Sequence, residues 1–247
     1  MLIDSDIDID IATRQFSEGY GFSASAVTPT CWNVVQKREH VLIGLSPNNS
    51  YFSAARILRL AHWACASFAS MHFLVLKEPY VRSLEAVGYS PARARAKAHK
   101  ALAAVETRAR RALESAGIED PDSRILTWQK LQTNSRYLQL RQDTYERFVI
   151  DEQLADACLG EARRYLYSHA QQLAGNASMD TRSRLAVTYY LNEVPLFVDT
   201  ASIVGTGSSA YCYHKMSEFH HNLYARKLSL QPSPHQARIV LMDSDSQ

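Results

Sequence analysis

One serine stands at the end of an apolar run and opens a short polar loop. Residues 41–45 (VLIGL) are apolar, Ser46 follows them, and a helical pattern begins just after the loop. A strand, a tight turn with an exposed hydroxyl and a helix are how α/β proteins present a nucleophile or bind a phosphate at the carboxyl edge of a parallel sheet. We therefore expect the chemistry of this chain around Ser46.

The loop matches neither of two common catalytic or phosphate-binding patterns. It starts with Gly44-Leu45-Ser46 but lacks the second glycine of the G-x-S-x-G elbow, and no Gly-Lys-Ser/Thr of a Walker A loop follows. Pro47 also removes a backbone N–H at a position that often stabilises an oxyanion. The alternative is that Ser46 only caps the next helix.

Tyr189 and Glu193 are four residues apart in a helical segment, so they share one face. Glu193 stands next to the apolar residues 194–197 (VPLF), where a carboxylate is costly without a partner. It could bind a cation such as a substrate ammonium. The alternative is an ion pair with Arg182 or Arg184.

Tyr213 and His214 close the run 208–214 (SSAYCYH), which reads as a strand. At the carboxyl edge of a sheet, a tyrosine hydroxyl can relay protons and a histidine can act as a base. The alternative is a buried tyrosine beside an ordinary histidine.

Residues 91–116 predict a long helix that begins at Ser90-Pro91 and ends near Gly117. Its apolar residues recur on one face, and the opposite face is basic: Arg93, Lys97, Lys100, Arg108, Arg110 and Arg111. Such a one-sided basic face can bind a phosphate backbone, and the alternative is a solubilising surface.

Strand-like runs alternate with helical patterns along the rest of the chain. We expect strands at 40–46, 71–77, 123–128, 208–214 and 237–243. We expect helices at 50–69, 91–116, 136–174 (as one helix or two), 181–197 and 220–227, with Pro195 ending the helix at 181–197. This alternation predicts an α/β fold with a mostly parallel sheet flanked by helices. We expect one domain over 1–247, weakly structured at about 1–30 and 244–247.

The composition excludes several classes of protein. Apolar residues make up 46% and charged residues 21% of the 247, and the net charge is +2, so nothing demands a polyanionic partner. The four cysteines form no CxxC pair, which indicates neither a disulfide framework nor a zinc site. The acidic N-terminus does not resemble a signal peptide, and no run is long enough to span a membrane. We expect a cytoplasmic protein without metal or cofactor, with no DNA or membrane partner; the oligomeric state is open, and a monomer fits.

Three motifs in this order resemble the cyclodipeptide synthase family. They are residues 44–52 (GLSPNNSYF), 189–197 (YYLNEVPLF) and 212–214 (CYH). With Asn49, Tyr213 and His214 present, the chain resembles the subgroup named for asparagine, tyrosine and histidine. The resemblance implies a Rossmann-type fold similar to the catalytic domain of class I tyrosyl- and tryptophanyl-tRNA synthetases.

The resemblance also implies the reaction and the partners. Two aminoacyl-tRNAs would give a cyclic dipeptide without ATP, through aminoacyl and dipeptidyl esters of Ser46. Tyr189 and Glu193 would hold the ammonium, Tyr213 would relay protons, and Asn49 and His214 would position the site. The basic helix would carry tRNA phosphates.

Two further expectations concern the substrates and the alternative functions of the chain. Leu42 and Gly44 share a strand face with Ser46 by the period of two, so we expect them to line the first aminoacyl pocket. The many apolar and aromatic residues suggest hydrophobic products. The rivals are a serine hydrolase on a doubly wound sheet and a non-catalytic tRNA-binding module; neither needs Glu193 with Tyr189.

Overall fold

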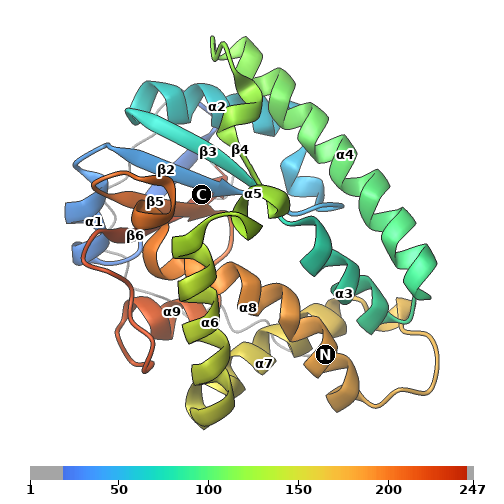
Figure 1. Ribbon diagram of the computed structural model, residues 1–247. Helices are drawn as coiled ribbons and strands as arrows, with labels where there is room; N and C mark the ends of the chain where they lie inside the picture. The colour runs from blue at the N-terminus through green and yellow to red at the C-terminus, as the bar shows by residue number, and fades with distance from the viewer. Residues whose placement is uncertain (1–18, 244–247) are drawn as a thin grey trace.

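The computed structural model describes residues 19–243, which fold around one six-stranded sheet (Figure 1). Its strands are β1 (Phe22–Ala26), β2 (His40–Gly44), β3 (Ser70–Val75), β4 (Ile125–Thr127), β5 (Ser209–Tyr213) and β6 (Gln236–Asp243). They lie in the order β1-β6-β5-β2-β3-β4. Only the β1–β6 pairing in this sheet is antiparallel, so the predicted mostly parallel sheet is confirmed.

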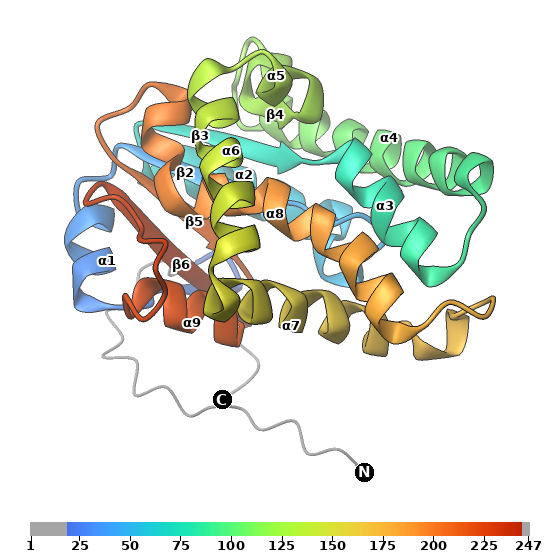
Figure 2. The ribbon, with the colours of Figure 1, turned by 60° about the horizontal axis from the view of Figure 1, so that its bottom comes forward.

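Helices cover the sheet and extend beyond it. They are α1 (Pro29–Val35), α2 (Ala54–Ser67), α3 (Lys77–Val87), α4 (Pro91–Ser115), α5 (Trp128–Gln132), α6 (Ser135–Ile150), α7 (Glu152–Ser168), α8 (Met179–Val204) and α9 (Glu218–Tyr224). Short 3₁₀ turns lie at Ser50–Phe52, Pro121–Arg124 and Ala170–Gln172. Figure 2 shows α8 crossing the molecule, and it packs against α3, α6, α7, β5 and β6.

The predicted amphipathic pattern of α4 is confirmed. The residues on its apolar face are buried at helical spacing: Ala94, Ala98, Leu102, Val105, Ala109 and Leu113. This face packs against α2, α3 and β3, and small alanines let the helix axes approach. The helix lies at the outside of the molecule (Figure 1), and Arg93, Lys97, Lys100 and Arg111 on its opposite face are exposed.

Two expectations about the elements are wrong. Residues 22–30 are not weakly structured, because β1 pairs with β6 over Phe22–Ala26 and α1 begins at Pro29; residues 1–18 and 244–247 lie outside the described residues. The helix α8 does not end at Pro195 but continues to Val204, with its one non-helical residue at Asp199. Val194, Leu196 and Phe197 are fully buried, and this burial outweighs the hydrogen bond that proline cannot make.

Some general features of the described residues bear on function. None of the helices within 19–243 is long and apolar enough to cross a membrane. In the same part of the chain, no three His, Cys, Asp or Glu side chains are grouped as a metal ion would require. Cys31, Cys65, Cys158 and Cys212 are all free thiols.

Candidate active site

Ser46 lies at the carboxyl edge of the sheet, two residues beyond the end of β2. Its Oγ is 2.7 Å from the hydroxyl of Tyr213, the last residue of the neighbouring strand β5, so the two hydroxyls share a hydrogen bond. From β2 the sheet continues through β3 and β4 on one side, and through β5 and β6 on the other. Ser46 and Tyr213 therefore meet at the topological switch point, where open α/β sheets bind their ligands.

The loop after Ser46 is fixed by its two asparagines. Asn48 adopts a left-handed conformation with φ 57°, which asparagine tolerates better than most residues, and its Nδ2 donates to the hydroxyl of Tyr80 at 3.0 Å. Asn49 Oδ1 accepts from the backbone N–H of Tyr51 at 3.0 Å, and Ser53 caps α2. The alternative that Ser46 is a helix cap is therefore wrong.

Asn49 and His214, to which the family resemblance assigns the positioning of the site, lie next to each other. The Asn49 Nδ2 is 3.4 Å from Nε2 of His214, and the imidazole stacks on Tyr51 with centroids 4.1 Å apart. Burial, with smaller effects from Lys215 and other cations, lowers the pKa of His214 to about 4. The imidazole is therefore neutral at neutral pH and packs 4.4 Å from the Tyr213 ring.

Glu193 accepts a hydrogen bond from the hydroxyl of Tyr211, on the same strand as Tyr213. Neither arginine proposed as its ion-pair partner reaches it. The guanidinium of Arg182 donates to backbone carbonyls, and that of Arg184 pairs with Asp180. Burial raises the pKa of Glu193 to about 7, against the lowering effects of the Tyr211 hydrogen bond and of Arg238.

Tyr189 shares the face of α8 with Glu193, one turn earlier. Burial, followed by the neighbouring charge of Glu193, raises the pKa of Tyr189 well above its usual value, and burial also raises that of Tyr213. Both phenols therefore stay protonated at neutral pH. A carboxylate beside neutral phenols, in a desolvated place, suits a small cation such as an ammonium.

Leu42 and Gly44, predicted to line a pocket, are tightly packed in this structure. Leu42 is fully buried in the core. A β-carbon at Gly44 would overlap the hydroxyl oxygen of Tyr211 and lie 3.1 Å from its Cζ. The missing side chain at Gly44 thus makes room for the hydroxyl that binds Glu193.

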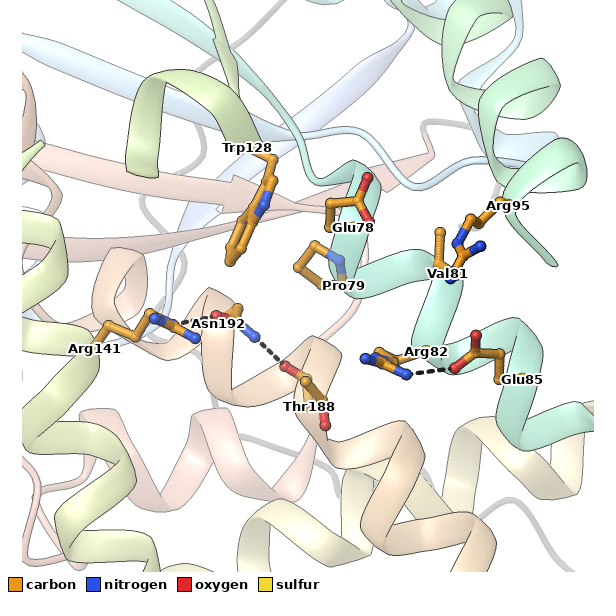
Figure 3. A pocket seen from close by; sticks show the side chains of 10 residues that line it. All are labelled: Glu78, Pro79, Val81, Arg82, Glu85, Arg95, Trp128, Arg141, Thr188 and Asn192. Atoms are coloured by element: carbon orange, nitrogen blue, oxygen red, sulfur yellow. Dashed lines mark hydrogen bonds and ion pairs between the residues drawn. The ribbon is translucent and has the colours of Figure 1, made fainter. Parts of the chain in front are cut away.

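A cleft of about 300 Å³ opens on the neighbouring face of α8 (Figure 3). Thr188 and Asn192, each one residue before Tyr189 and Glu193, form one wall. Trp128 faces Pro79 across it, and Arg141 donates to the Asn192 Oδ1 at 2.6 Å. Its other lining residues are Glu78, Val81, Arg82, Glu85 and Arg95. Sequence patterns did not reveal this cleft, because its walls come from α3, α4, α5, α6 and α8.

The six basic residues predicted on α4 fall into two groups. Arg93, Lys97, Lys100 and Arg111 are exposed. Arg110 pairs with Asp122 at 2.8 Å, and Arg108 donates to the backbone carbonyl of Phe52 at 2.9 Å. Arg108 therefore connects α4 to the loop that follows Ser46.

Sequence reasoning missed Tyr211 and Arg238, although both left a signal. Tyr211 precedes Tyr213 by two residues, so both side chains point to the same face of β5. Arg238 is the one charged residue in 237–242 (ARIVLM), an otherwise apolar buried strand. Burying a charge in such a strand costs folding free energy, so its presence there indicates a special role for the residue.

Taken together, the fold and the site define a class of protein: a single α/β domain with a serine and a tyrosine hydroxyl at its switch point and a carboxylate nearby. The family model "Cyclodipeptide synthase" matches residues 22–243. The chain belongs to the cyclodipeptide synthase family.

Curated relatives and solved structures agree with this assignment. The chain is 30% identical over 226 residues to a cyclo(L-tyrosyl-L-tyrosyl) synthase of Mycobacterium tuberculosis, covering 92% of this chain and 78% of the relative. It is 30% identical to a cyclo(L-leucyl-L-leucyl) synthase of Bacillus subtilis, covering 90% of each. A cyclodipeptide synthase structure from Bacillus thermoamylovorans superposes with TM-score 0.82 at 27% identity, over 90% of this chain and 96% of that one.

A further structure connects the fold to another class of enzyme. It is a Mycobacterium tuberculosis protein whose structure relates cyclodipeptide synthetases to type I tRNA synthetases. It superposes with TM-score 0.79 at 29% identity, over 96% of this chain and 98% of that one. The expected likeness to class I synthetase domains is therefore confirmed at the level of the fold.

Proposed function

We propose that this protein makes a cyclic dipeptide from two aminoacyl-tRNAs, without ATP, by acyl transfer through Ser46. The observation that carries the proposal is the hydrogen bond between Ser46 and Tyr213, 2.7 Å long, beside Glu193 on α8. An aminoacyl ester is already activated, so its transfer needs neither ATP nor a metal. The proximity of Asn49, Tyr213 and His214 supports the proposal.

In the first step, the Ser46 Oγ attacks the ester carbonyl carbon of one aminoacyl-tRNA. The bond to the ribose oxygen breaks, and this oxygen leaves with a proton relayed from Ser46 through the hydroxyl of Tyr213. Glu193 and Tyr189 hold the ammonium of the aminoacyl group, so that its carbonyl is directed at Ser46. The product is an aminoacyl ester of Ser46 and a free tRNA.

Three further attacks complete the reaction. The amine of the second aminoacyl-tRNA attacks the Ser46 ester carbonyl, which forms the peptide bond, frees the Ser46 Oγ and leaves the dipeptide as an ester of the second tRNA. The Ser46 Oγ then attacks the ester carbonyl of this dipeptidyl-tRNA, and the ribose oxygen of the second tRNA leaves with the proton. The free amine of the dipeptide finally attacks the carbonyl of the new Ser46 ester, which closes the six-membered ring and returns the proton to the Ser46 Oγ. Tyr213 serves each step as the hydroxyl that passes the proton.

The surface of α4 is proposed to bind the tRNA phosphates. Arg93, Lys97, Lys100 and Arg111 are exposed on it, and Arg108 leads from it to the Ser46 loop. We place the reaction in the cytoplasm, where aminoacyl-tRNAs are made, and propose hydrophobic products. Relatives described as cyclo(L-tyrosyl-L-tyrosyl) and cyclo(L-leucyl-L-leucyl) synthases support the latter.

Expression in a bacterium and mass spectrometry of the medium test the activity. We expect new cyclic dipeptides from the wild type and none from Ser46→Ala, because the hydroxyl proposed to take the ester is then missing. Ser50→Ala, an exposed serine of the same loop, is the matched control and keeps the product. In a purified reaction without ATP, intact-protein mass spectrometry should find the aminoacyl adduct on the wild type and on Ser50→Ala, but not on Ser46→Ala.

The result also separates the proposal from a non-catalytic RNA-binding module. Such a module binds tRNA but releases no cyclic dipeptide, and Ser46→Ala leaves its behaviour unchanged. Wild-type protein that is folded, binds aminoacyl-tRNA and yields no diketopiperazine contradicts the proposed activity.

A further inference from the structure

Arg238 is a fully buried charge on β6, the strand between β1 and β5. The residue is 0% exposed, and its Nη2 donates to the backbone carbonyl of Lys215 at 2.8 Å. Its Nε and Nη1 have no hydrogen-bond partner, and no carboxylate within residues 19–243 forms an ion pair with it. Burying a guanidinium in this way costs folding free energy, which indicates that the charge has a function.

The surroundings of Arg238 are the aromatic rings of the site. Its guanidinium carbon lies 4.9 Å from the ring centroid of Tyr211, 5.8 Å from that of Phe197 and 5.9 Å from that of Tyr213. Cation–π contact offsets part of the cost of burial. The same positive charge makes the phenol of Tyr211 a stronger hydrogen-bond donor, because it draws electron density from the ring.

Through its hydrogen bond, the hydroxyl of Tyr211 transmits the effect of the Arg238 charge to Glu193. It donates to the Glu193 Oε1. The hydroxyl fits there because residue 44 is a glycine, whose missing side chain leaves the space it occupies. Gly44, Tyr211 and Arg238 thus come from three adjacent strands, β2, β5 and β6: Gly44 and Arg238 lie against Tyr211, and Tyr211 donates to Glu193.

We propose that Tyr211 and Arg238 are positioning residues that favour the ionised form of Glu193 and orient it toward the substrate ammonium. The inference rests on the proposed function, since it gives Glu193 the task of binding that ammonium. Neither residue touches the reacting atoms. Tyr211 acts through its hydrogen bond and Arg238 through its charge behind Tyr211.

Several ionisable groups face Glu193 from the elements packed around it. They are Tyr211 and Tyr213 of β5, Arg238 of β6, Tyr137 of α6, and Tyr189 and Tyr190 of α8 itself. Arg141 of α6 is engaged with Asn192. The phenols are neutral near pH 7 because burial raises the pKa of each of them. Arg238 is therefore the charge that favours the carboxylate.

The direction of the effect follows from these contacts. Burial raises the pKa of Glu193 to about 7, and the Tyr211 hydrogen bond and Arg238 both lower it. Removing either one should raise that pKa further. A site that needs the carboxylate then loses activity at neutral pH and recovers it at higher pH.

Tyr211→Phe tests the inference, with Tyr224→Phe as the matched control. Tyr224 is also a buried phenol, but its hydroxyl donates to the carbonyls of Phe197 and Ala237. Carbon-13 NMR of glutamate-labelled protein follows the titration of Glu193, assigned by the peak that is absent in Glu193→Gln. We expect the midpoint to rise by about one pH unit in Tyr211→Phe, a tenfold change in the proton equilibrium, and to stay in Tyr224→Phe.

The rate of cyclic dipeptide formation gives the second readout. With that shift, Tyr211→Phe should lose about fivefold in rate at pH 7, and the loss should shrink as the pH rises above 8. Tyr224→Phe, by contrast, should change the rate equally at every pH. A loss in Tyr211→Phe that is constant with pH, with an unshifted Glu193 titration, overturns the inference.

Arg238→Met extends the test to the buried charge. We expect the Glu193 midpoint to rise, and Arg238→Lys, which keeps a positive charge, to bring it back toward the wild type. If Arg238→Met does not fold, Tyr211→Phe alone decides. The titration needs no substrate: a shifted midpoint in a protein that makes no cyclic dipeptide supports the electrostatic inference while contradicting the proposed function.

Discussion

At the scale of single residues, the site contains a group that suits the proposed chemistry but lowers the stability of the fold. Glu193 is a carboxylate in a desolvated place, and its pKa is raised by burial to about 7 from an ordinary value near 4.5. The folded state therefore binds this proton more tightly than the unfolded chain does. The stability that the protonated form contributes is present at low pH and is lost as the pH rises through 7.

Replacing this carboxylate by an amide should therefore stabilise the fold. In Glu193→Gln the neutral side chain still accepts a hydrogen bond from Tyr211. We expect the free energy of unfolding to rise by at most about 3 kcal/mol at pH 8, and the gain to vanish near pH 5, while activity is lost. Thermal unfolding of both proteins across this range measures the effect. A gain independent of pH contradicts a raised pKa.

Residue-level contacts were also the hardest to predict from sequence. Tyr189 and Glu193 could be paired because helical spacing places them on one face. The partner of Glu193 could not, because Tyr211 reaches it through the packing of α8 on β5. The local arginines that the sequence offered instead bind backbone carbonyls and Asp180.

At the scale of elements, sequence predicts best where one period dominates. The helix α4 was predictable because its inward residues recur without interruption and Pro91 marks its start. The helix α3 was missed, since it begins directly after β3 with Pro79 in its first turn and has no linking loop. The Pro195 rule failed because tertiary burial of α8 overrides a local preference.

The exposed basic face of α4 yields a prediction of its own. Lys100→Glu with Arg111→Glu should weaken tRNA binding and reduce the slope of log affinity against log salt by about two, one for each phosphate that the variant no longer neutralises. Arg108 is left in place because it supports the Ser46 loop. Fluorescence anisotropy with labelled tRNA over a salt series measures both quantities.

Lys227→Glu is the control for this pair. Lys227 is exposed beyond the end of α9, away from α4, and the charge change is of the same kind. We expect its salt slope to match the wild type. Lys227→Glu changes the net charge by half as much as the α4 double variant, so a loss of affinity in Lys227→Glu about half as large, on a logarithmic scale, indicates a general effect of net charge and contradicts a binding face.

At the scale of the whole molecule, strand order assembles the site. Ser46 and Tyr213 are 167 residues apart in sequence, and β2 and β5 become neighbours only because the chain returns after β4 to the other side of β2. The alternation of strands and helices predicted the parallel sheet. It could not predict the order of strands, which depends on how the helical layers pack.

A second cluster of buried polar side chains lies near the amino-terminal ends of β2, β3 and β5, opposite the edge that holds Ser46, and affects the stability of the fold. There His40 Nε2 lies 2.9 Å from His72 Nδ1, and His40 Nδ1 lies 2.7 Å from the Ser209 hydroxyl. Burial, followed by the neighbouring His72, lowers the pKa of His40 to about 3. Burial, followed by the charge of Arg124, lowers the pKa of His72 to about 4. Both imidazoles are neutral in the folded state.

Acid should therefore unfold the protein through this pair. The unfolded chain takes up protons near pH 6.5, so the stability is complete above that pH and is lost as the pH falls toward 4. At pH 5 each histidine should cost about 2 kcal/mol. In His72→Asn the fall in melting temperature between pH 7 and pH 5 should be smaller, whereas His235→Asn, at an exposed position, should follow the wild type. Glu193 is present in all three proteins, so its opposite contribution to the pH dependence of stability cancels in the comparison. Equal slopes of melting temperature against pH in all three would show that the buried histidines do not cause the loss of stability in acid.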